Sequence, residues 1–275
     1  MTQARSTTPS TGKPGRDQFD ALAAEAMPKL RGVIRRMVGN PDDTNDLVQD
    51  SLLRAYEKFS SFRGDSSFST WLVSIGTRAA LNHLRSRKQW RWDAQIHIAR
   101  QMHGTDDGKT ALKDLFSSPQ HRFDAREHIA FCFTCVGRSL TPDHNAALVL
   151  RDVLGYSNRE AAKILGLSES VLRHRLGDAR KTMIERFDGL CGIVSKKGVC
   201  YQCEGLRNTT AAEHRGPEVP KIGSEDESSE ERYRVRLTVL QDRDIDDGQT
   251  QMLHDLVWRA MTRHEANHAD SAAAP

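Results

Sequence analysis

The stretch 157–181, SNREAAKILGLSESVLRHRLGDARK, constrains the fold more than any other part of the chain. Ser157 and Glu160 have the spacing of a capping box, which begins a helix. Gly166 would end that helix, and Ser168 would cap the next one. Apolar residues of the second helix recur at helical spacing and are expected to face inward: Val171, Leu172, Leu176 and Ala179. The pattern predicts a helix-turn-helix, whose second helix enters the major groove of DNA.

Polar and basic residues remain for the outer face of this second helix. Arginine can bind guanine through two hydrogen bonds, worth about 1–3 kcal/mol of discrimination, and basic residues later on the helix suit phosphates. The candidate DNA-contacting residues are Glu169, Ser170, Arg173, His174, Arg175, Arg180 and Lys181. Asp178 lies among them and would weaken the grip on phosphate.

The charge of the chain is segregated rather than large. The net charge is +3 over 275 residues, but basic residues gather near 85–91 and 173–181, and acidic residues gather in 224–231 and 242–247. Such segregation lets basic faces bind nucleic acid while acidic parts stay away from it. No apolar run approaches the roughly 20 residues that cross a bilayer, and the first residues lack the core of a secretory signal. We therefore expect a cytoplasmic protein that does not bind membranes.

Hydrophobic periodicity predicts an all-α fold with two small helical domains. We expect helices over 20–38, 42–59, 68–87, 126–138 and 142–154, followed by the helix-turn-helix. The 42–59 helix carries one apolar stripe, expected to be core: Val48, Leu52, Ala55, Tyr56 and Phe59. Residues 232–240, RYRVRLTVL, alternate like a strand, and 249–265 form an amphipathic helix.

These elements predict a division of the chain into five parts. Residues 1–17 form a disordered arm, 18–90 a first helical domain, 91–124 a linker and 125–187 a second helical domain. Residues 188–275 form an extension with a cysteine-containing segment, an acidic linker and a C-terminal amphipathic helix.

Both helical parts resemble one family. Residues 42–87, DDTNDLVQDSLLRAYEKFSSFRGDSSFSTWLVSIGTRAALNHLRSR, resemble region 2 of bacterial sigma factors of the extracytoplasmic-function group, in the sigma-70 family. Residues 139–183, SLTPDHNAALVLRDVLGYSNREAAKILGLSESVLRHRLGDARKTM, resemble region 4 of the same group. FCFTCVGRSL and CGIVSKKGVCYQCEGL are similar to a subset of the group with a cysteine-bearing extension.

The resemblance implies a subunit that joins core RNA polymerase, through its β′ clamp and β flap, and initiates transcription at selected promoters. Region 4 would read the minus-thirty-five element as duplex, and region 2 would melt and hold the minus-ten element. The subunit would carry no catalytic site and require no cofactor. A separate anti-sigma factor, or the chain's own C-terminal extension, would be a further partner. The alternative for the extension is a tail that packs on region 4 or stays disordered.

Within region 2 the resemblance implies two sets of binding residues. The outer face of the 42–59 helix would dock on polymerase through Asp43, Asp46, Gln49, Asp50 and Leu53. Melted bases need a stacking surface, a polar rim and basic residues that neutralise the backbone. The candidates for that surface are Arg63, Ser66, Ser67, Phe68, Trp71, Arg78, Asn82, Arg85 and Arg87. The alternatives are a solvated helix face for the first set, and core or capping roles for Phe68, Trp71 and the two serines.

Five cysteines include two CxxC pairs, Cys132 with Cys135 and Cys200 with Cys203, and leave Cys191 over. Two such pairs can form a tetrahedral thiolate zinc site, structural or sensory. His128 lies four residues before Cys132, on the same helix face, and is a further candidate ligand. A redox switch and inert burial remain alternatives.

Two other classes of function compete with the sigma factor. A helix-turn-helix regulator acting on duplex DNA without joining polymerase has no need of the 42–87 pattern. An enzyme would need a recognisable site, and the sequence contains no P-loop, nucleophile elbow, HExxH or glycine-rich dinucleotide loop. We therefore expect no enzyme.

Overall fold

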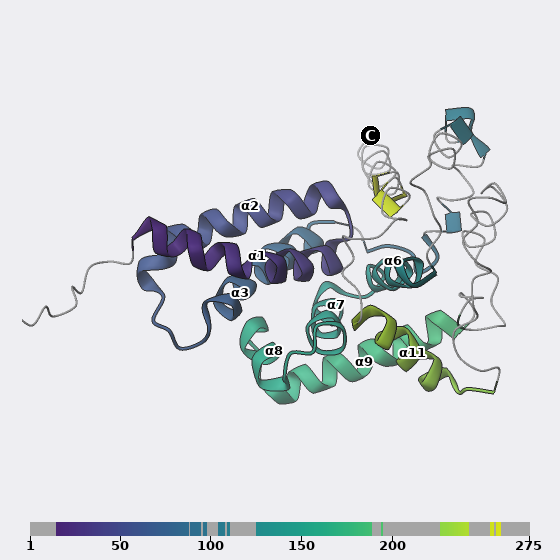
Figure 1. Cartoon of the computed structure of the whole chain (residues 1–275). Helices are drawn as coiled ribbons and strands as arrows, with labels where there is room; N and C mark the ends of the chain where they lie inside the picture. The colour runs from purple at the N-terminus through teal and green to yellow at the C-terminus, as the bar shows by residue number, and fades with distance from the viewer. Residues whose placement is uncertain are drawn as a thin grey trace, which may run out of the picture.

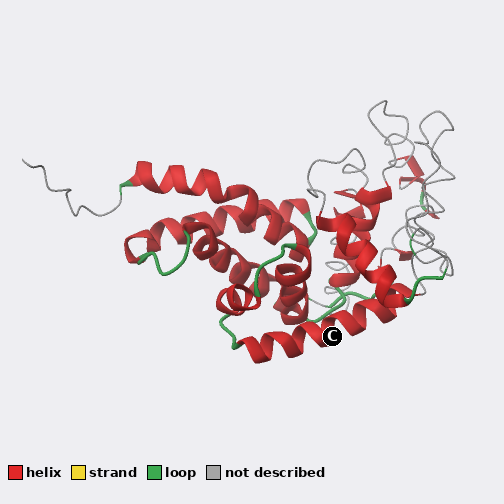
Figure 2. Ribbon diagram, turned by 60° about the horizontal axis from the view of Figure 1, so that its bottom comes forward, coloured by secondary structure: helices red, strands yellow, loops and turns green. Residues whose placement is uncertain are grey.

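The computed structural model describes two long parts of the chain and several short ones. The described residues are 15–87, 89–94, 96–97, 104–107, 109–110, 125–188, 194, 226–241, 254–255 and 257–259. Within them the secondary structure is helical and includes no strand, as Figure 2 shows, so the prediction of an all-α fold is confirmed. Among the same residues, no helix is both long enough and apolar enough to cross a membrane.

The N-terminal helices are α1 (Arg16–Val38), α2 (Pro41–Lys58) and α3 (Phe68–Arg85), with a 3₁₀ turn (Phe59–Ser61) after α2. They form the left part of Figure 1. Asn40 caps α2 by accepting hydrogen bonds from the backbone N–H groups of Asp42 and Asp43, at 2.8 and 3.1 Å. Helix α1 already begins at Arg16, so residues 16 and 17 of the predicted arm are helical, and residues 1–14 lie outside the described residues.

Gly76 sets how closely α1 and α3 pack. A Cβ atom built at this position would lie 2.3 Å from Cδ1 of Leu30 and 3.2 Å from Cδ1 of Ile34. Only a residue without a side chain therefore fits between the two helices. The close approach fixes the orientation of α3, on which most of the predicted minus-ten residues lie.

The C-terminal half of the described fold contains α6 (Ala125–Gly137), α7 (Pro142–Leu148), α8 (Asn158–Leu165) and α9 (Glu169–Asp188). The predicted helix over 142–154 is interrupted: α7 passes into a π-helical turn at Val149–Val153. The predicted helix-turn-helix is confirmed as α8 and α9. Both hydrogen bonds of the Ser157–Glu160 capping box are present, and Gly166 ends α8 with φ +68°.

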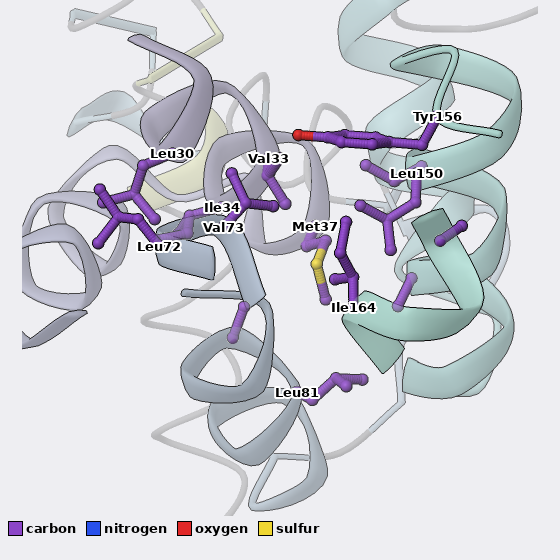
Figure 3. Close-up of a cluster of buried hydrophobic side chains, with 14 of the residues drawn as sticks. Leu30, Val33, Ile34, Met37, Leu72, Val73, Leu81, Leu150, Tyr156 and Ile164 are labelled. Carbon is purple, nitrogen blue, oxygen red and sulfur yellow. The ribbon is translucent and has the colours of Figure 1, made fainter. Parts of the chain in front are cut away.

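One hydrophobic core joins the N-terminal helices to the helix-turn-helix. Figure 3 shows Met37 of α1 near Leu150 and Ile164, which belong to the C-terminal half, and Ile34 of α1 belongs to the same cluster of buried side chains. The side-chain amide of Asn145 on α7 donates a hydrogen bond to the backbone oxygen of Met37, at 3.2 Å, and both residues are buried. The two halves therefore pack against each other directly.

The C-terminal extension contributes a helix where a strand was predicted. Residues 232–240 belong to α11 (Ser229–Gln241), so the strand prediction is wrong. Ser228 and Glu231 form the reciprocal hydrogen bonds of a capping box at its start. The buried residues of α11 share one helical face: Arg236 lies three positions after Tyr233, and the adjacent Val239 and Leu240 lie three and four positions after Arg236.

Helix α11 packs on α6 and α9, and a further helical segment returns to the N-terminal helices. The guanidinium of Arg236 lies 4.5 Å from the ring centroid of Phe187 on α9. Further along, residues 254–255 and 257–259 are helical, which agrees with the predicted helix over 249–265 at the positions described. Trp258 in this segment is buried and its ring lies 5.0 Å from that of Trp90.

Candidate nucleic-acid interface

Helix α9 presents a polar face to solvent and an apolar stripe to the core. Leu172, Leu176 and Ala179 are buried as predicted. Val171 is not: 43% of its surface is exposed, so its predicted core position is wrong. The stripe that packs inward continues to Met183 at steps of three and four residues, and position 171 lies about 100° away from Leu172 around the helix. The predicted DNA-contacting residues of α9 are exposed apart from Arg175, which is half-buried.

Arg175 and Arg85 are held by the same carboxylate. Nη1 of Arg175 lies 2.7 Å from Oδ1 of Asp143, and Nη2 of Arg85 lies 3.1 Å from the same oxygen. Arg175 is a predicted base reader on α9, and Arg85 is a predicted minus-ten contact on α3. Asp143 lies in the first turn of α7 and joins two surfaces that the sequence analysis assigned to separate stretches of DNA.

Arg180 has a structural partner in addition to its predicted phosphate role. Its guanidinium forms two hydrogen bonds with the buried carboxylate of Asp152, at 2.8 and 2.6 Å. The hydrogen bond with Asp152 raises the pKa of Arg180 above its usual value, although partial burial opposes the shift. This pairing attaches α9 to the π-helical turn.

Asp178, the acidic residue among the DNA candidates, faces a neighbour on its own helix. Its Oδ2 lies 3.2 Å from Nδ1 of His174, one turn earlier. The carboxylate therefore offsets the positive charge of a protonated His174 rather than standing alone on the predicted DNA face.

In the loop before α3, the capping and core alternatives apply to two of the predicted minus-ten residues. The hydroxyl of Ser67 accepts a hydrogen bond from the backbone N–H of Thr70, at 3.1 Å, and caps α3. Phe68 is buried between Phe59 and Phe62, with ring centroids 5.8 Å from each. Trp71 is only half-buried, so its ring reaches the surface beside the loop.

Other predicted minus-ten residues lie on open surface. Arg63 has 85% of its side chain exposed, and Arg78 and Asn82 are exposed along α3, while Ser66 is half-buried. Arg63 and Ser66 lie in the loop before α3, and Arg78 and Asn82 lie in the C-terminal half of that helix, so the predicted contacts are spread along the length of α3.

Asp43 joins the predicted DNA face to the predicted polymerase face. Its carboxylate lies 3.4 Å from Nε2 of His83, in the last turn of α3, and 3.2 Å from Nη2 of Arg87, just after that helix. Burial raises the pKa of Asp43, but the hydrogen bond with His83 and the charge of Arg87 outweigh it, so the pKa is lowered overall.

The outer face of α2 carries two exposed apolar side chains among charged ones. Leu53 is 65% exposed, and Asp46 and Gln49 are also exposed, whereas Asp50 is half-buried and pairs with Arg54 at 2.9 Å. Tyr56, predicted to be core, is 48% exposed, and its ring meets Phe19 only edge-on at 5.2 Å. Leu53 and Tyr56 are three residues apart and share a face, so their exposure extends the predicted docking surface.

The described cysteines lie in a buried cluster with two histidines. Cys132 and Cys135 on α6 are buried. Nε2 of His128 lies 3.5 Å from Sγ of Cys132, and Nδ1 of His128 lies 3.4 Å from Nε2 of His254. The sequence analysis missed His254, which no local spacing connects to α6. Cys191, Cys200 and Cys203 lie outside the described residues, and within the described ones no three metal-binding side chains converge.

The C-terminal segment is tied to the start of α2 and to α1. Arg259 binds the carboxylate of Asp42 with two hydrogen bonds, at 2.9 and 3.1 Å, and Asp255 lies 2.8 Å from the buried guanidinium of Arg35. The hydrogen bond from Arg259 lowers the pKa of Asp42. Two ion pairs thus hold residues near the end of the chain against the N-terminal helices.

Both helical parts of the chain match family models. The family model described as Sigma-70 region 2 matches residues 22–91, and that described as Sigma-70, region 4 matches residues 132–183. The RNA polymerase sigma-H factor of Pseudomonas aeruginosa is 31% identical over 165 residues, which are 60% of this chain and 83% of that protein. The ECF RNA polymerase sigma-E factor of Haemophilus influenzae is 31% identical over 167 residues, 61% of this chain and 85% of that protein.

One solved structure with a similar chain is a co-crystal of the sigma factor RpoE with the anti-sigma factor NepR from Bartonella quintana. It has a TM-score of 0.43 and 21% sequence identity, and the match covers 62% of this chain and 98% of that chain.

Proposed function

Because the chain belongs to the sigma-70 family, as an RNA polymerase sigma factor of the extracytoplasmic-function group, we propose that separate surfaces of it bind the polymerase and the two promoter elements during transcription initiation. Members of this family bind core RNA polymerase and promoter DNA and are not enzymes. The chain would act in the cytoplasm, where polymerase and promoters meet.

In region 4, α9 would read the minus-thirty-five element as duplex DNA. The observation that carries this assignment is the exposed polar face of α9 above a buried apolar stripe. Its early residues Arg173 and His174 would reach base edges, and Lys181, later on the helix, would contact phosphate. Region 4 as a whole would rest on the β flap.

In region 2, the loop around Arg63 and the exposed side of α3 would hold the melted minus-ten strand. Trp71 offers a partly exposed ring for base stacking, and Arg78 and Asn82 offer polar contacts to the strand. Leu53 and Tyr56 on α2 would dock on the β′ clamp, since exposed apolar side chains on a charged face suit a protein partner.

Run-off transcription with purified core polymerase tests this function. A library of promoters is transcribed with and without the protein, and selective initiation at a subset is expected. A variant with Leu53→Ala and Tyr56→Ala should lose association with core polymerase but keep its helical content. A protein that binds duplex DNA yet never makes core polymerase initiate would instead be a conventional helix-turn-helix regulator.

We also propose that the chain's own C-terminal extension acts as its regulatory partner, in place of a separate anti-sigma factor. The contacts of Arg259 and Asp255 with the N-terminal helices, and of α11 with α6 and α9, bridge the two DNA-binding regions. In the same arrangement Asp143 holds both Arg175 and Arg85. This closed form would keep two DNA-contacting arginines from promoter DNA until polymerase separates the regions.

Replacement of Asp143 by asparagine tests the closed form. Asp143→Asn should raise the affinity of the free full chain for the minus-thirty-five duplex several-fold, because it releases Arg175, the predicted base reader on α9. Asp178→Asn is the matched control. It also removes one negative charge, but Asp178 pairs with His174 on α9, so neither Arg175 nor Arg85 is released. Equal gains for the two variants would contradict the closed form and leave only a general charge effect.

A zinc site is proposed for the buried cluster on α6. Tetrahedral zinc with the usual Zn–S and Zn–N bond lengths separates a sulfur and a nitrogen ligand by about 3.5 Å. His128 and Cys132 have that separation, and His254 contacts the other ring nitrogen of His128, as outer-shell partners of zinc-binding histidines do. Of the further ligands predicted from the sequence, Cys135 is buried on the same helix, and Cys200 and Cys203 lie outside the described residues.

Metal analysis of the purified full chain tests the zinc site. We expect about one zinc per chain, and a cobalt-substituted protein with the visible absorption of thiolate ligation. Cys132→Ser should lower zinc occupancy, whereas Cys191→Ser, outside the CxxC pairs, should not. Absence of bound metal from protein purified under reducing conditions with added zinc would contradict the site.

A further inference from the structure

Among the described residues, four large hydrophobic side chains are exposed, and Val171 is the one that lies on α9. Its neighbours Glu169 and Ser170 are exposed and polar, and His174 and Arg175 follow it by three and four residues on the same face. Val171 therefore lies in the middle of the surface proposed to enter the major groove, in the first turn of the helix.

The position of Val171 is fixed by its surroundings. Its backbone N–H donates a hydrogen bond to the hydroxyl of Ser168, at 3.3 Å, which anchors the first turn of α9. A valine in a helix occupies one strongly preferred χ1 rotamer, so its two methyl groups point in a set direction. The side chain is thus preorganised, and little entropy is lost when it meets a partner.

The chemistry of valine restricts what it can recognise in DNA. Its side chain neither donates nor accepts a hydrogen bond, so it gains nothing from the polar edges of the bases. The major groove offers one apolar group, the C5-methyl of thymine. A base pair with guanine or cytosine opposite Val171 would instead leave polar base edges without water or a partner.

We propose that Val171 is a specificity-determining residue that selects thymine in the duplex minus-thirty-five element by packing against its C5-methyl group. This inference rests on the proposed function of α9. It extends that function by naming a base and an apolar contact, where the sequence analysis considered polar and charged contacts alone.

Removal of the single methyl group tests the contact. Each thymine of a minus-thirty-five element selected in run-off transcription is replaced in turn by deoxyuridine, which keeps every hydrogen-bonding group. Binding of the holoenzyme formed with core polymerase should weaken about fourfold at one position, as expected for about 0.8 kcal/mol per buried methyl-sized group. At that position, the Val171→Ala holoenzyme should show little difference between thymine and deoxyuridine.

Two further variants separate the methyl contact from a general loss of binding. Val171→Ile keeps an apolar branched side chain and should keep the deoxyuridine penalty. Ser170→Ala alters the adjacent exposed residue and should also keep it, whatever its effect on overall affinity. Because Val171 is exposed, its substitution should leave thermal stability nearly unchanged, which a melting curve checks.

The outcomes distinguish this inference from the function on which it rests. An unchanged deoxyuridine penalty in Val171→Ala, the absence of a penalty at every thymine, or a selected element without thymine would overturn the role of Val171. Each of these leaves promoter-specific initiation intact. A holoenzyme that shows no preference for any minus-thirty-five element would overturn the proposed function of α9, and the role of Val171 with it.

Discussion

Asp43 is the residue at which the two predicted faces of region 2 meet. It belongs to the first turn of α2, and its carboxylate faces His83, in the last turn of α3, and Arg87, just after that helix. A role in docking on polymerase would compete with this pairing, because one carboxylate can satisfy few partners at a time. Its first contribution is therefore to the stability of region 2.

The lowered pKa of Asp43 predicts how that contribution depends on pH. Since the pKa is below its unfolded value, the carboxylate stabilises the native state fully above about pH 4, and this stabilisation is lost as pH falls through the lowered native pKa. Asp43→Asn should lower the free energy of unfolding at pH 7 by about 1.5–3 kcal/mol, as loss of a charged hydrogen bond does. Urea denaturation at several pH values measures it.

The difference between Asp43→Asn and the unchanged protein should narrow below pH 4. Asp46→Asn, an exposed position on the same helix, is the control and should change stability by no more than about 0.5 kcal/mol. A difference that stays constant down to pH 2 would contradict the assignment.

Single residues were predictable from sequence where a local signal exists. The Ser157–Glu160 capping box and the left-handed Gly166 follow from short-range chemistry and were predicted correctly. The apolar pattern predicts core positions for Val171 and Tyr56, because both are apolar and lie near the apolar stripe of their helix. A helix turns by about 100° per residue, so a neighbour of a buried residue can face solvent, and pattern alone does not settle such borderline positions.

The packing of α1 on α3 depends on the missing side chain of Gly76. Gly76→Ala introduces a Cβ atom 2.3 Å from Cδ1 of the buried Leu30, so the Leu30 side chain or the helices must shift, and we expect a loss of about 1–3 kcal/mol in the free energy of unfolding. Chemical denaturation followed by circular dichroism measures the loss.

Gly177 on α9 provides the matched control for that substitution. Nothing lies within 4 Å of a Cβ atom at this position, so Gly177→Ala should stabilise the helix by about 0.5–1 kcal/mol. If both alanine variants gained stability, the close approach of α1 and α3 would be wrong.

The sequence predicts where most helices lie, but it does not distinguish the helix at 232–240 from a strand or the π-helical turn after α7 from an α-helix. The strand predicted over 232–240 failed because its alternation of apolar and basic residues also fits one buried helical face. The Ser228–Glu231 spacing was the local signal that favoured a helix. The π-helical turn after α7 had no such signal, since nothing in the sequence VLRDV distinguishes it from an α-helix.

Regions 2 and 4 contribute buried apolar residues to one hydrophobic core. Leu150 and Ile164 of region 4 lie in the same cluster as Ile34 and Met37 of region 2, as Figure 3 shows. A core that crosses the boundary couples the stability of the two regions, in contrast to domains joined only by a linker.

Coupled regions should unfold together. We expect one urea transition for regions 2 and 4 of the full chain, and Leu150→Ala should move the whole transition by about 2–5 kcal/mol in the free energy of unfolding. Fluorescence of the tryptophans and circular dichroism, recorded together, report it. Leu53→Ala, at an exposed position, is the control.

Two separate transitions, of which Leu150→Ala shifts only one, would contradict a shared core. The sequence could not predict this coupling, because it depends on contacts such as Arg259 with Asp42, which are 217 positions apart. Local periodicity predicts which face of each helix is apolar but not which distant helix covers it.

Gly39 has a consequence for how chains of this kind can diverge. Its φ of +84° already favours glycine, and a Cβ atom there would lie 2.0 Å from the indole ring of Trp258. Positions 39 and 258 should therefore change together in homologues that retain the C-terminal segment. In those that have lost it, only the positive φ still favours glycine at position 39, so other residues should replace it more often.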